Sequence, residues 1–344
     1  MRGKVLVIGA GIAGITASLG LAQAGHEVFL LEREKEVGGK GRFYSCKAAE
    51  LCQQCSACLI PKTRAKLEHN PNIHILPYSM LTDFHGSPGH YRANIRLLNE
   101  IRSDLGAETS LEVQAVVAAT GFEIHNPAVQ AELNYEIHKQ VISAYELESI
   151  LAEPSKLNEK LGGLRRIGIV LCVGSRDERA HSANYCSRYC CAYAQRLALR
   201  LSYLLPNTQL NIFYTELLTA SSKEIESNQI KLIRSTPAKV YGYPANSLTV
   251  RFADSYTGSV SDDEYDLLIL MPAQKPTNDL SLQFPQLGLS YDENGFYKDN
   301  NPDTDGNTGV FVAGSCSGPK NIPESIAHAK ATVARVLQYL AQAH

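Results

Sequence analysis

The apolar run KVLVI at the start of the chain turns directly into closely spaced glycines, and this junction most constrains the fold. Gly9, Gly11 and Gly14 match the pattern G-x-G-x-x-G, and the residues that follow have helix-forming composition. A second apolar run, HEVFLLE, ends in Glu32. Strand, glycine turn, helix, strand and acidic residue in this order predict a dinucleotide-binding α/β unit.

Each residue of this turn has a physical task in such a unit. Gly9 allows the tight turn, Gly11 lets the backbone approach a pyrophosphate, and Gly14 allows the helix to pack closely on the strand. The helix N-terminus, which includes Ala13, faces the phosphates. Glu32 can accept hydrogen bonds from the adenosine ribose hydroxyls.

Three further segments indicate that the nucleotide is FAD. The segment REKEVGGKGR after Glu32, the turn VVAATG and the late strand GVFVAG resemble, in this order, segments of flavoproteins with two dinucleotide-binding domains. The last one leads into an expected helix at residues 322–340. The residues expected to contact FAD in and beside these segments are Arg33, Gly39, Lys40, Arg42, Thr120, Gly121, Gly314, Ser315, Lys320 and Ile322.

One position departs from that flavoprotein pattern. The residue after the last glycine is usually Asp, which contacts the ribityl chain, and here it is Ser315. A neutral hydroxyl can still form a hydrogen bond at that position. The segment Gly318-Pro319-Lys320, just before the last helix, is expected to cover the flavin.

A second feature is a cysteine cluster in the middle of the chain, CVGSRDERAHSANYCSRYCC. Cys172 follows an apolar run that predicts a buried strand, and a helix is expected over residues 187–205. Cys186 and Cys190 are four apart and would share one face of that helix, with Cys191 about 100° around the axis. Three thiolates at a helix N-terminus and one from a strand end could surround a [4Fe-4S] cluster.

The spacing alone leaves two other interpretations open. Free cysteines are often buried and only fill space. A zinc site is the third option, although adjacent cysteines are unusual as zinc ligands and the common ferredoxin pattern is absent. His181, Tyr185, Tyr189 and Tyr193 around the expected helix are predicted to be packing and capping residues.

Another cysteine group lies just after the glycine pair of the FAD segment. Cys46, Cys52, Cys55 and Cys58 are spaced C-x5-C-x2-C-x2-C. The position resembles that of the redox-active cysteine pair in pyridine nucleotide disulfide reductases, while overlapping C-x2-C units also hold zinc or clusters. A dithiol facing the flavin, a second metal site and unpaired thiols all remain open.

The strand that ends near Cys172 is expected to begin a second nucleotide-type domain. Its turn contains Gly174, but Cys172 and Arg176 stand where a dinucleotide turn would have glycines. Phosphates would therefore lose the close backbone approach that glycine allows. The sequence disfavours NAD(P)H at this turn.

Taken together, CVGSRDE…YCSRYCC, the C-S-A-C-L loop and AGSCSGPKNIPESIAHA resemble the A-subunit family of heterodisulfide reductase over nearly the whole chain. The resemblance implies a thioredoxin-reductase-like fold, FAD, and a [4Fe-4S] cluster held by Cys172, Cys186, Cys190 and Cys191. The chain resembles in particular the short form of this family, which is found in heterodisulfide-reductase-like complexes of sulfur oxidisers. At the position of Arg196 the family often has Lys near the flavin. Arg196, as a fixed cation, would then tune the flavin potential.

The resemblance implies an α/β flavoprotein with a discontinuous FAD domain (residues 1–135 and 275–344) and a second Rossmann-like domain (136–274). Its expected function is electron relay between FAD and the cluster in sulfur metabolism, as a homodimer with other subunits of the complex. The alternative is a stand-alone NAD(P)H-dependent disulfide reductase that uses the loop of Cys46 to Cys58.

Composition sets the remaining bounds. The chain has 344 residues, enough for two cores, and a net charge of -2, which gives no reason to expect nucleic acid. It contains no apolar run long enough to cross a membrane and no basic, apolar leader. Nine cysteines, clustered and odd in number, indicate reduced thiols or metal ligands, so a cytoplasmic protein is expected.

Overall fold

The structure is a computed structural model, and it describes residues 2–98, 107–179, 182–218, 225, 227–242, 247–277, 279–299 and 308–342. His181 lies outside these described residues.

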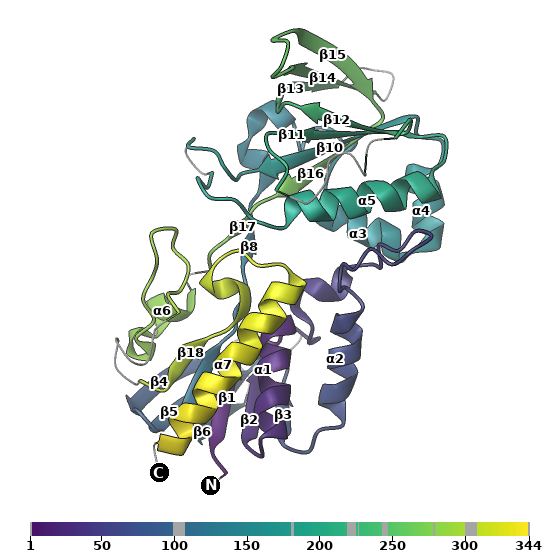
Figure 1. Ribbon diagram of the computed structural model, residues 1–344. Helices are drawn as coiled ribbons and strands as arrows, with labels where there is room; N and C mark the ends of the chain where they lie inside the picture. Colours follow the sequence, from purple (N-terminus) through teal and green to yellow (C-terminus); the bar gives the residue numbers. More distant parts are fainter. Residues whose placement is uncertain are drawn as a thin grey trace. The chain divides into compact units, whose positions relative to one another are not determined.

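The chain divides into two compact units (Figure 1). Unit 1 comprises Met1–Arg42, Ser56–Glu123 and Pro276–His344, and unit 2 comprises Phe43–Cys55 and Ile124–Lys275. Compared with the ranges expected from the sequence, residues 124–135 and Phe43–Cys55 pack with unit 2.

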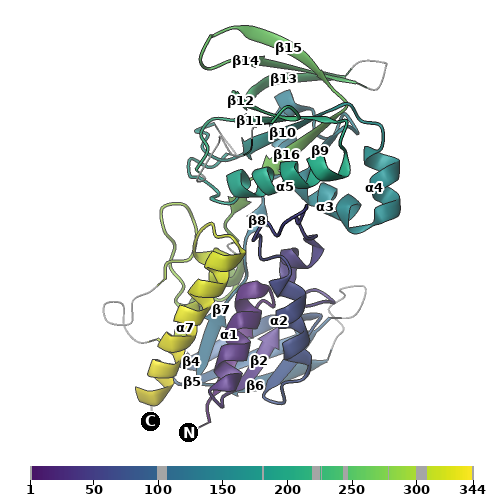
Figure 2. The ribbon, with the colours of Figure 1, turned by 45° about the vertical axis from the view of Figure 1, so that its right-hand side comes forward.

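Unit 1 is built on a parallel sheet of five strands in the order β18-β7-β1-β2-β3, with an antiparallel sheet β4-β5-β6 beside it. Helices α1 and α7 pack against each other, and α2 packs against α1 (Figure 2). The bounds are β1 Lys4–Ile8, α1 Ile12–Gln23, β2 Glu27–Leu31, α2 Leu59–Glu68, β3 Ile73–Leu76, β4 Ser79–Ser87, β5 His90–Leu97, β6 Glu108–Val113, β7 Ala115–Ala118, α6 Asp279–Gln283, β18 Val310–Val312 and α7 Ile322–Gln342.

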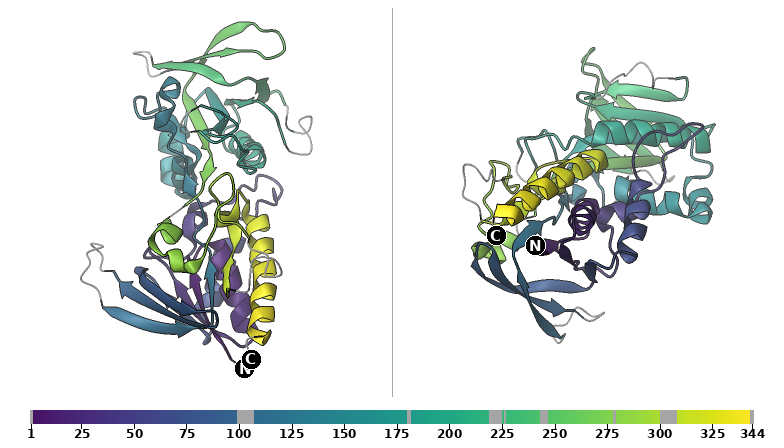
Figure 3. Two further views of the ribbon diagram at one scale, coloured as in Figure 1. Left: turned by 90° about the vertical axis from the view of Figure 1, so that its left-hand side faces the viewer. Right: turned by 60° about the horizontal axis from the view of Figure 1, so that its bottom comes forward.

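Side-chain alternation along β1 explains why unit 1 has three layers. Val5 and Val7 point into the core shared with α1 and α7. Leu6 and Ile8 point into a second core that contains Phe84 of the antiparallel sheet. Because successive strand residues face opposite sides, the parallel sheet is covered on one face by helices and on the other by β4–β6 (Figure 3).

Unit 2 repeats this plan with a parallel sheet β12-β11-β10-β16-β9 and an antiparallel sheet β13-β14-β15. Short strands β8 and β17 pair with each other. The bounds are β8 Glu123–Ile124, β9 Val141–Ser143, α3 Ala144–Ala152, α4 Pro154–Leu161, β10 Arg166–Val173, α5 Cys190–Leu204, β11 Gln209–Tyr214, β12 Ile230–Arg234, β13 Pro237–Gly242, β14 Leu248–Ala253, β15 Val260–Tyr265, β16 Leu267–Pro272 and β17 Gln274–Lys275.

The same alternation builds the two cores of unit 2. Ile167 and Ile169 of β10 share a core with Leu197 of α5. Val170 belongs to the other core, together with Val250 of the antiparallel sheet. The α/β fold with parallel sheets expected from the sequence is confirmed.

The segment Phe43–Cys55 is fastened to α3 and α5 by a buried ionic network. The Lys47 ammonium lies 2.6 Å from Glu148 Oε1 of α3, with side-chain exposures of 2% and 1%. The Ser45 N–H and hydroxyl both donate to Glu148 Oε2 at 2.8 Å, and the Tyr193 hydroxyl of α5 donates to Oε1. This network explains why the segment belongs to unit 2.

Breaking this pair on one side tests how much it contributes. In the variant Lys47→Met the Glu148 carboxylate stays buried without its countercharge, so the free energy of unfolding should fall by about 3–5 kcal/mol. Lys156→Met, which removes the partner of Glu153 in an exposed pair, is the matched control and should cost about 0–1 kcal/mol. Urea unfolding followed by circular dichroism measures both. Equal losses in the two variants would contradict a structural role for the buried pair.

Candidate cofactor and thiol sites

The glycine turn after β1 combines close backbone packing with one open position. Gly9 has φ +101°, and a Cβ on it would lie 2.5 Å from the Ala119 carbonyl oxygen. A Cβ on Gly14 would lie 1.9 Å from the Gly9 carbonyl oxygen, so α1 packs tightly on this turn. A Cβ on Gly11 would meet no protein atom within 4 Å. The space beside Gly11 therefore suits a ligand that approaches the backbone.

The N-terminus of α1 and the end of β2 supply the polar groups of this site. No side chain caps α1 and its first turn contains no acidic residue, which suits an anion. Glu32 is 7% exposed. Its carboxylate accepts hydrogen bonds from the Ala10 N–H at 2.9 Å and the Glu34 N–H at 3.0 Å. These bonds fix the carboxylate at the carboxyl end of the strand, where open α/β sheets bind ligands.

Several other residues predicted to contact FAD lie close to this turn. A Cβ on Gly39 would lie 2.9 Å from the Gly11 Cα, and one on Gly314 would lie 2.4 Å from the Ala13 Cβ. The Lys40 ammonium is 5.1 Å from the centre of the Phe122 ring. Burial lowers the pKa of Lys40, and the charge of Arg33 lowers it further.

Other predicted FAD residues are engaged with protein groups. The Thr120 hydroxyl lies 3.2 Å from the Thr277 hydroxyl. Arg42 donates to the Glu36 carbonyl at 3.2 Å, and Arg33 lies 3.9 Å from Glu34. The Lys320 ammonium donates to the Ser317 carbonyl and hydroxyl, both at 3.0 Å. Gly121 has a positive φ of 78° and Ile322 is the first residue of α7.

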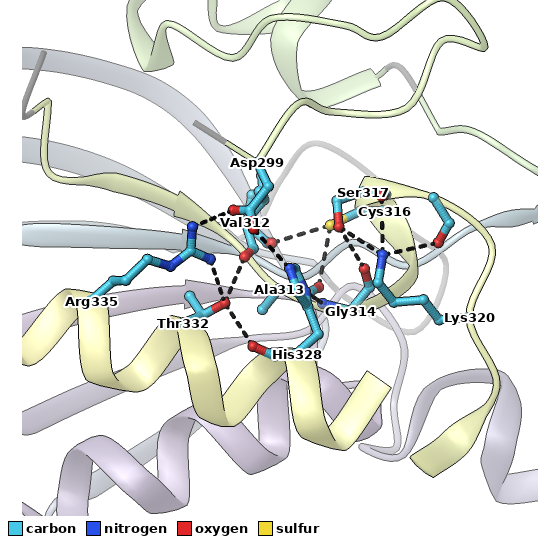
Figure 4. A network of polar contacts seen from close by, with 12 residues as sticks. Asp299, Val312, Ala313, Gly314, Cys316, Ser317, Lys320, His328, Thr332 and Arg335 are labelled. Atoms are coloured by element: carbon cyan, nitrogen blue, oxygen red, sulfur yellow. Dashed lines mark hydrogen bonds and ion pairs between the residues drawn. The ribbon is translucent and has the colours of Figure 1, made fainter. Parts of the chain in front are cut away.

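Figure 4 shows a polar network around Gly314 that the sequence did not predict. His328 of α7 accepts a hydrogen bond from the Gly314 N–H at 2.9 Å through Nδ1, and its Nε2 lies 3.0 Å from Asp299. The Asp299 carboxylate also accepts a hydrogen bond from the Arg335 guanidinium at 2.6 Å. The network fixes the turn Gly314–Ser317, a 3-10 helix that contains Ser315, against α7.

Cys316 in this turn is a structural cysteine. It is 2% exposed, and its Sγ lies 3.3 Å from the Ala118 and Ala313 carbonyl oxygens. Burial raises its pKa to about 11. The thiol therefore stays protonated and links the end of β7 to the turn that follows β18.

The cysteine group of the middle of the chain, Cys172, Cys186, Cys190 and Cys191, lies around the end of β10 and the start of α5. Cys172 has φ +59° and interrupts the register between β10 and β16, which is how a β-bulge re-aims a side chain. The expected helix start was wrong: α5 begins at Cys190, and Arg188 has φ +59°, which breaks the helical path. Cys186 therefore lies outside the helix and does not share a helical face with Cys190.

Three of these four thiols hydrogen-bond to one another. Hydrogen bonding with its neighbours Cys172 and Cys191, to either of which its single S–H can donate, holds the pKa of Cys190 well above the usual value. The same bonds lower the pKa of Cys172 to about 7 and that of Cys191 to about 6. Burial raises the pKa of Cys186, and the charges of Cys172 and Cys191 raise it further. The four sulfurs therefore interact electrostatically.

Thiol groups suit iron as ligands, but these four thiols are not arranged around a common metal position. Thiolate sulfur is the usual ligand of iron–sulfur clusters. Within the ranges that the structure describes, no set of three or more His, Cys, Asp or Glu side chains is arranged to hold a metal ion. The thiols of Cys172, Cys190 and Cys191 instead shift one another's pKa.

The cysteine group of residues 46–58 is divided between the two units. Cys46, Cys52 and Cys55 belong to unit 2 and Cys58 to unit 1. Cys46, Cys52 and Cys58 are exposed and Cys55 is partly buried. Among the described side chains, none of these thiols takes part in a metal-binding arrangement.

Arg196 of α5 contacts this cysteine loop. Its Nε donates to the Gln53 carbonyl at 2.8 Å, between Cys52 and Cys55. Arg200, one turn later on α5, donates to the Ala48 carbonyl at 2.7 Å. Within unit 2, the residue predicted to tune the flavin thus holds the backbone between two cysteines.

Residues 3–332 match the pyridine nucleotide-disulphide oxidoreductase family. The chain belongs to this family. It is therefore an oxidoreductase, and the family assignment supports FAD as its cofactor.

Curated relatives confirm the resemblance to the A-subunit family of heterodisulfide reductase. The chain is 27% identical to an iron-sulfur A-subunit of CoB–CoM heterodisulfide reductase of Methanopyrus kandleri, over 98% of this chain and 64% of that protein. It is 25% identical to the A-subunit of the H(2):CoB-CoM heterodisulfide,ferredoxin reductase of Methanothermobacter marburgensis, over 96% of this chain and 63% of that protein. The chain thus spans less than two thirds of the length of these relatives.

Solved structures confirm the thioredoxin-reductase-like fold. Thioredoxin reductase of Lactococcus lactis superimposes with a TM-score of 0.63 at 15% identity, over 99% of this chain and 100% of that one. The T. acidophilum thioredoxin reductase has the same TM-score and identity, over 99% and 98% of the two chains. No helix in the described parts of the chain is long and apolar enough to cross a membrane.

Two alanine substitutions separate the packing role of the glycine turn from its ligand role. Gly14→Ala places a Cβ against the Gly9 carbonyl and should lower the melting temperature of the protein without FAD. Gly11→Ala meets no protein atom, so it should leave that temperature unchanged and weaken FAD binding. Thermal unfolding of the FAD-free protein and FAD titration measure the two effects. Unchanged FAD affinity in Gly11→Ala would contradict a pyrophosphate beside Gly11.

The Asp299 network predicts a pH dependence of stability. Burial alone would raise the pKa of Asp299, but the hydrogen bonds from His328 and Arg335 outweigh it and leave the pKa lowered. A lowered pKa contributes stability above the unfolded-state pKa of about 3.9, and that contribution is lost as the pH falls through the lower folded value.

Asp299→Asn should therefore be less stable than the wild type at neutral pH, by about 1 kcal/mol or less because the carboxylate is partly exposed. The difference should shrink as the pH falls below about 4. Thermal unfolding of both proteins between neutral and acidic pH measures it. A difference that stays constant over this range would contradict the ionic role of Asp299.

Proposed function

We propose that this chain is an FAD and [4Fe-4S] electron-transfer subunit of a heterodisulfide-reductase-like complex in sulfur metabolism. The observation that carries the proposal is the placement of four cysteines at the end of β10 and around the start of α5, where Cys172 stands in a β-bulge. A dinucleotide turn would occupy this place in a second Rossmann-like unit. Unit 1 meanwhile keeps the full glycine turn and Glu32.

The two proposed cofactors complement each other, since FAD takes up two electrons and releases them singly while a cluster carries one at a time. In unit 1, Gly11 would leave room for the FAD pyrophosphate, Gly39 lets its loop pack against Gly11, and Glu32 would accept hydrogen bonds from the ribose hydroxyls. In unit 2, Cys172, Cys186, Cys190 and Cys191 would hold the iron. The N-terminus of α5 favours their negative charge.

NAD(P)H does not bind at the second turn in this proposal. A Cβ on Gly174 would lie 2.2 Å from the ring of His125, so this glycine makes room for a side chain rather than for a phosphate. Cys172 and Arg176, both with positive φ, stand where further glycines would be needed. Electrons would then enter through a partner protein.

The names of the relatives, which are subunits, support partner subunits for this chain. The chain spans less than two thirds of those proteins, so their activities are not carried over as a whole. Analogy of fold alone supports a homodimer, and the clustered, odd number of cysteines supports a cytoplasmic location.

Metal analysis of protein purified without oxygen tests the proposal. We expect about four iron and four sulfide per chain, together with FAD. Cys190→Ser should lose the iron. Cys316→Ser, in which a hydroxyl can replace a buried thiol outside the group, should keep it. One zinc per chain without sulfide would instead indicate a flavin-binding scaffold and contradict the proposal.

A second candidate function is that of a disulfide reductase. The exposed thiols of Cys46 and Cys52 favour it, as does the hydrogen bond from Arg196 to the backbone between Cys52 and Cys55. It predicts that NADPH reduces the flavin rapidly without partners, and that Cys52→Ser abolishes reduction of an added disulfide.

Arg196→Gln and Arg200→Gln distinguish the roles of the arginine. If Arg196 acts on the dithiol, Arg196→Gln changes the Cys52–Cys55 thiol–disulfide equilibrium while Arg200→Gln does not. A change in the flavin potential of Arg196→Gln alone would favour the flavin-tuning role. The thiol–disulfide equilibrium is measured by alkylation and mass spectrometry, and the flavin potential by a spectroscopic titration.

A further inference from the structure

His125 is a buried histidine without a hydrogen-bond partner. It follows β8, is 1% exposed, and its backbone N–H donates to the Ala273 carbonyl at 2.9 Å. Neither Nδ1 nor Nε2 of its ring has a partner in the described structure. A buried polar group is normally paired, so an unpaired imidazole indicates a partner that the polypeptide itself does not provide.

The ring lies against the turn that follows Cys172. An ideal Cβ on Gly174 would lie 2.2 Å from Cδ2 and 2.4 Å from Nε2 of His125, so only glycine at 174 admits the ring at this distance. The Ala273 N–H donates to the Val173 carbonyl at 2.8 Å, which joins the segment bearing His125 to the same turn. The turn between Cys172 and Ser175 is closed by the Ser175 N–H, which donates to the Cys172 carbonyl at 3.1 Å.

A second unpaired polar atom belongs to this turn. The Ser175 side chain is 2% exposed, and its hydroxyl also has no partner in the described structure. Two buried side chains with unpaired polar atoms therefore lie at the turn after Cys172: His125 packs against Gly174, and Ser175 is the next residue. Cys172 is the one proposed iron ligand on β10.

We propose that His125 and Ser175 donate hydrogen bonds to sulfur of the cysteine-bound cluster and thereby raise its reduction potential. This rests on the proposed function, because it requires a cluster at Cys172. Hydrogen bonds to cluster sulfur stabilise the more negative, reduced state, and groups around the ligands are a general means of tuning iron–sulfur potentials.

The protonation state of His125 agrees with this role. Burial lowers its pKa to about 4, Lys275 lowers it further, and Asp177 acts in the opposite direction. The ring is therefore neutral at neutral pH and has one N–H donor. A neutral donor adds a hydrogen bond without adding a buried charge.

The test uses His125→Leu, which fills the space of the ring but donates no hydrogen bond, and Ser175→Ala. The matched control is His138→Leu. His138 is in the same unit and also packs against a glycine, with an ideal Cβ on Gly242 2.2 Å from its ring, but the strand of that glycine, β13, contains no cysteine. All proteins are purified without oxygen, and an electrochemical titration follows the cluster by electron paramagnetic resonance and the flavin by absorbance.

We expect the cluster potential to fall in His125→Leu and in Ser175→Ala, with the flavin potential unchanged, and to stay at the wild-type value in His138→Leu. His125→Gln, which keeps an N–H donor, should restore part of the shift. If His125→Leu loads iron poorly, restored loading in His125→Gln but not in His125→Asp would support the same donor role.

An unchanged cluster potential in fully loaded His125→Leu and Ser175→Ala overturns the inference and leaves the proposed function intact. Poor loading in both His125→Leu and His125→Gln also overturns it, because the ring would then act only through packing. Absence of iron from the wild-type protein overturns the proposed function and the inference together.

Discussion

In each unit the central strand of the parallel sheet, β1 in unit 1 and β10 in unit 2, ends in a turn, and the space beside that turn limits what the unit can hold. In unit 1 the backbone is so close-packed that a Cβ on Gly14 would overlap the Gly9 carbonyl, while the position beside Gly11 stays open. In unit 2 the corresponding turn is filled from inside the protein by the ring of His125. The turn after this strand is therefore open to a ligand beside Gly11 in unit 1, whereas in unit 2 a side chain packs against Gly174.

The closed turn changes the chemistry that this position can support. A dinucleotide site needs glycines so that phosphates can approach backbone N–H groups. Here Cys172 adopts a positive φ in a β-bulge, and its thiol interacts with Cys190 at the start of α5. Sulfur donors and a helix N-terminus both suit a cofactor bound through cysteines.

Local patterns in the sequence predicted the parts of the fold that depend on neighbouring residues. The glycine turn, the strand over Lys4–Ile8 and the last helix follow from apolar periodicity and fixed glycine spacing, and the structure has them. The start of α5 was wrong by one turn, because helix-forming composition does not reveal the left-handed Arg188. The antiparallel strands β4–β6, β13 and β15 were not predicted.

The missing site residues share a physical reason, which is that their partners are distant in sequence. Nothing near Lys47 indicates that Glu148 will neutralise it 101 residues later. His125 follows an ordinary-looking strand, and only the tertiary structure places it against Gly174. For Cys316 a signal was present in the motif AGSCSG, yet the spacing to the other cysteines gave it no partner.

Helix α5 packs on the sheet with one face and holds the segment Phe43–Cys55 with a second face about 100° around its axis. Ala194, Leu197 and Leu201 are buried in the core shared with β10, which fixes the helix on the sheet. Tyr193, Arg196 and Arg200 are three and four residues apart, so they lie along one face, and all three hold the segment Phe43–Cys55 or its partner Glu148.

The thiols at the start of the helix and those of Cys46, Cys52 and Cys55 are therefore parts of one packed body. Because the Lys47–Glu148 pair is buried, releasing this segment would expose or unpair a charge, which is costly. The segment that carries Cys46, Cys52 and Cys55 is consequently held on the helix that begins at Cys190. This is a physical reason for a segment that interrupts unit 1 in sequence to be built into unit 2.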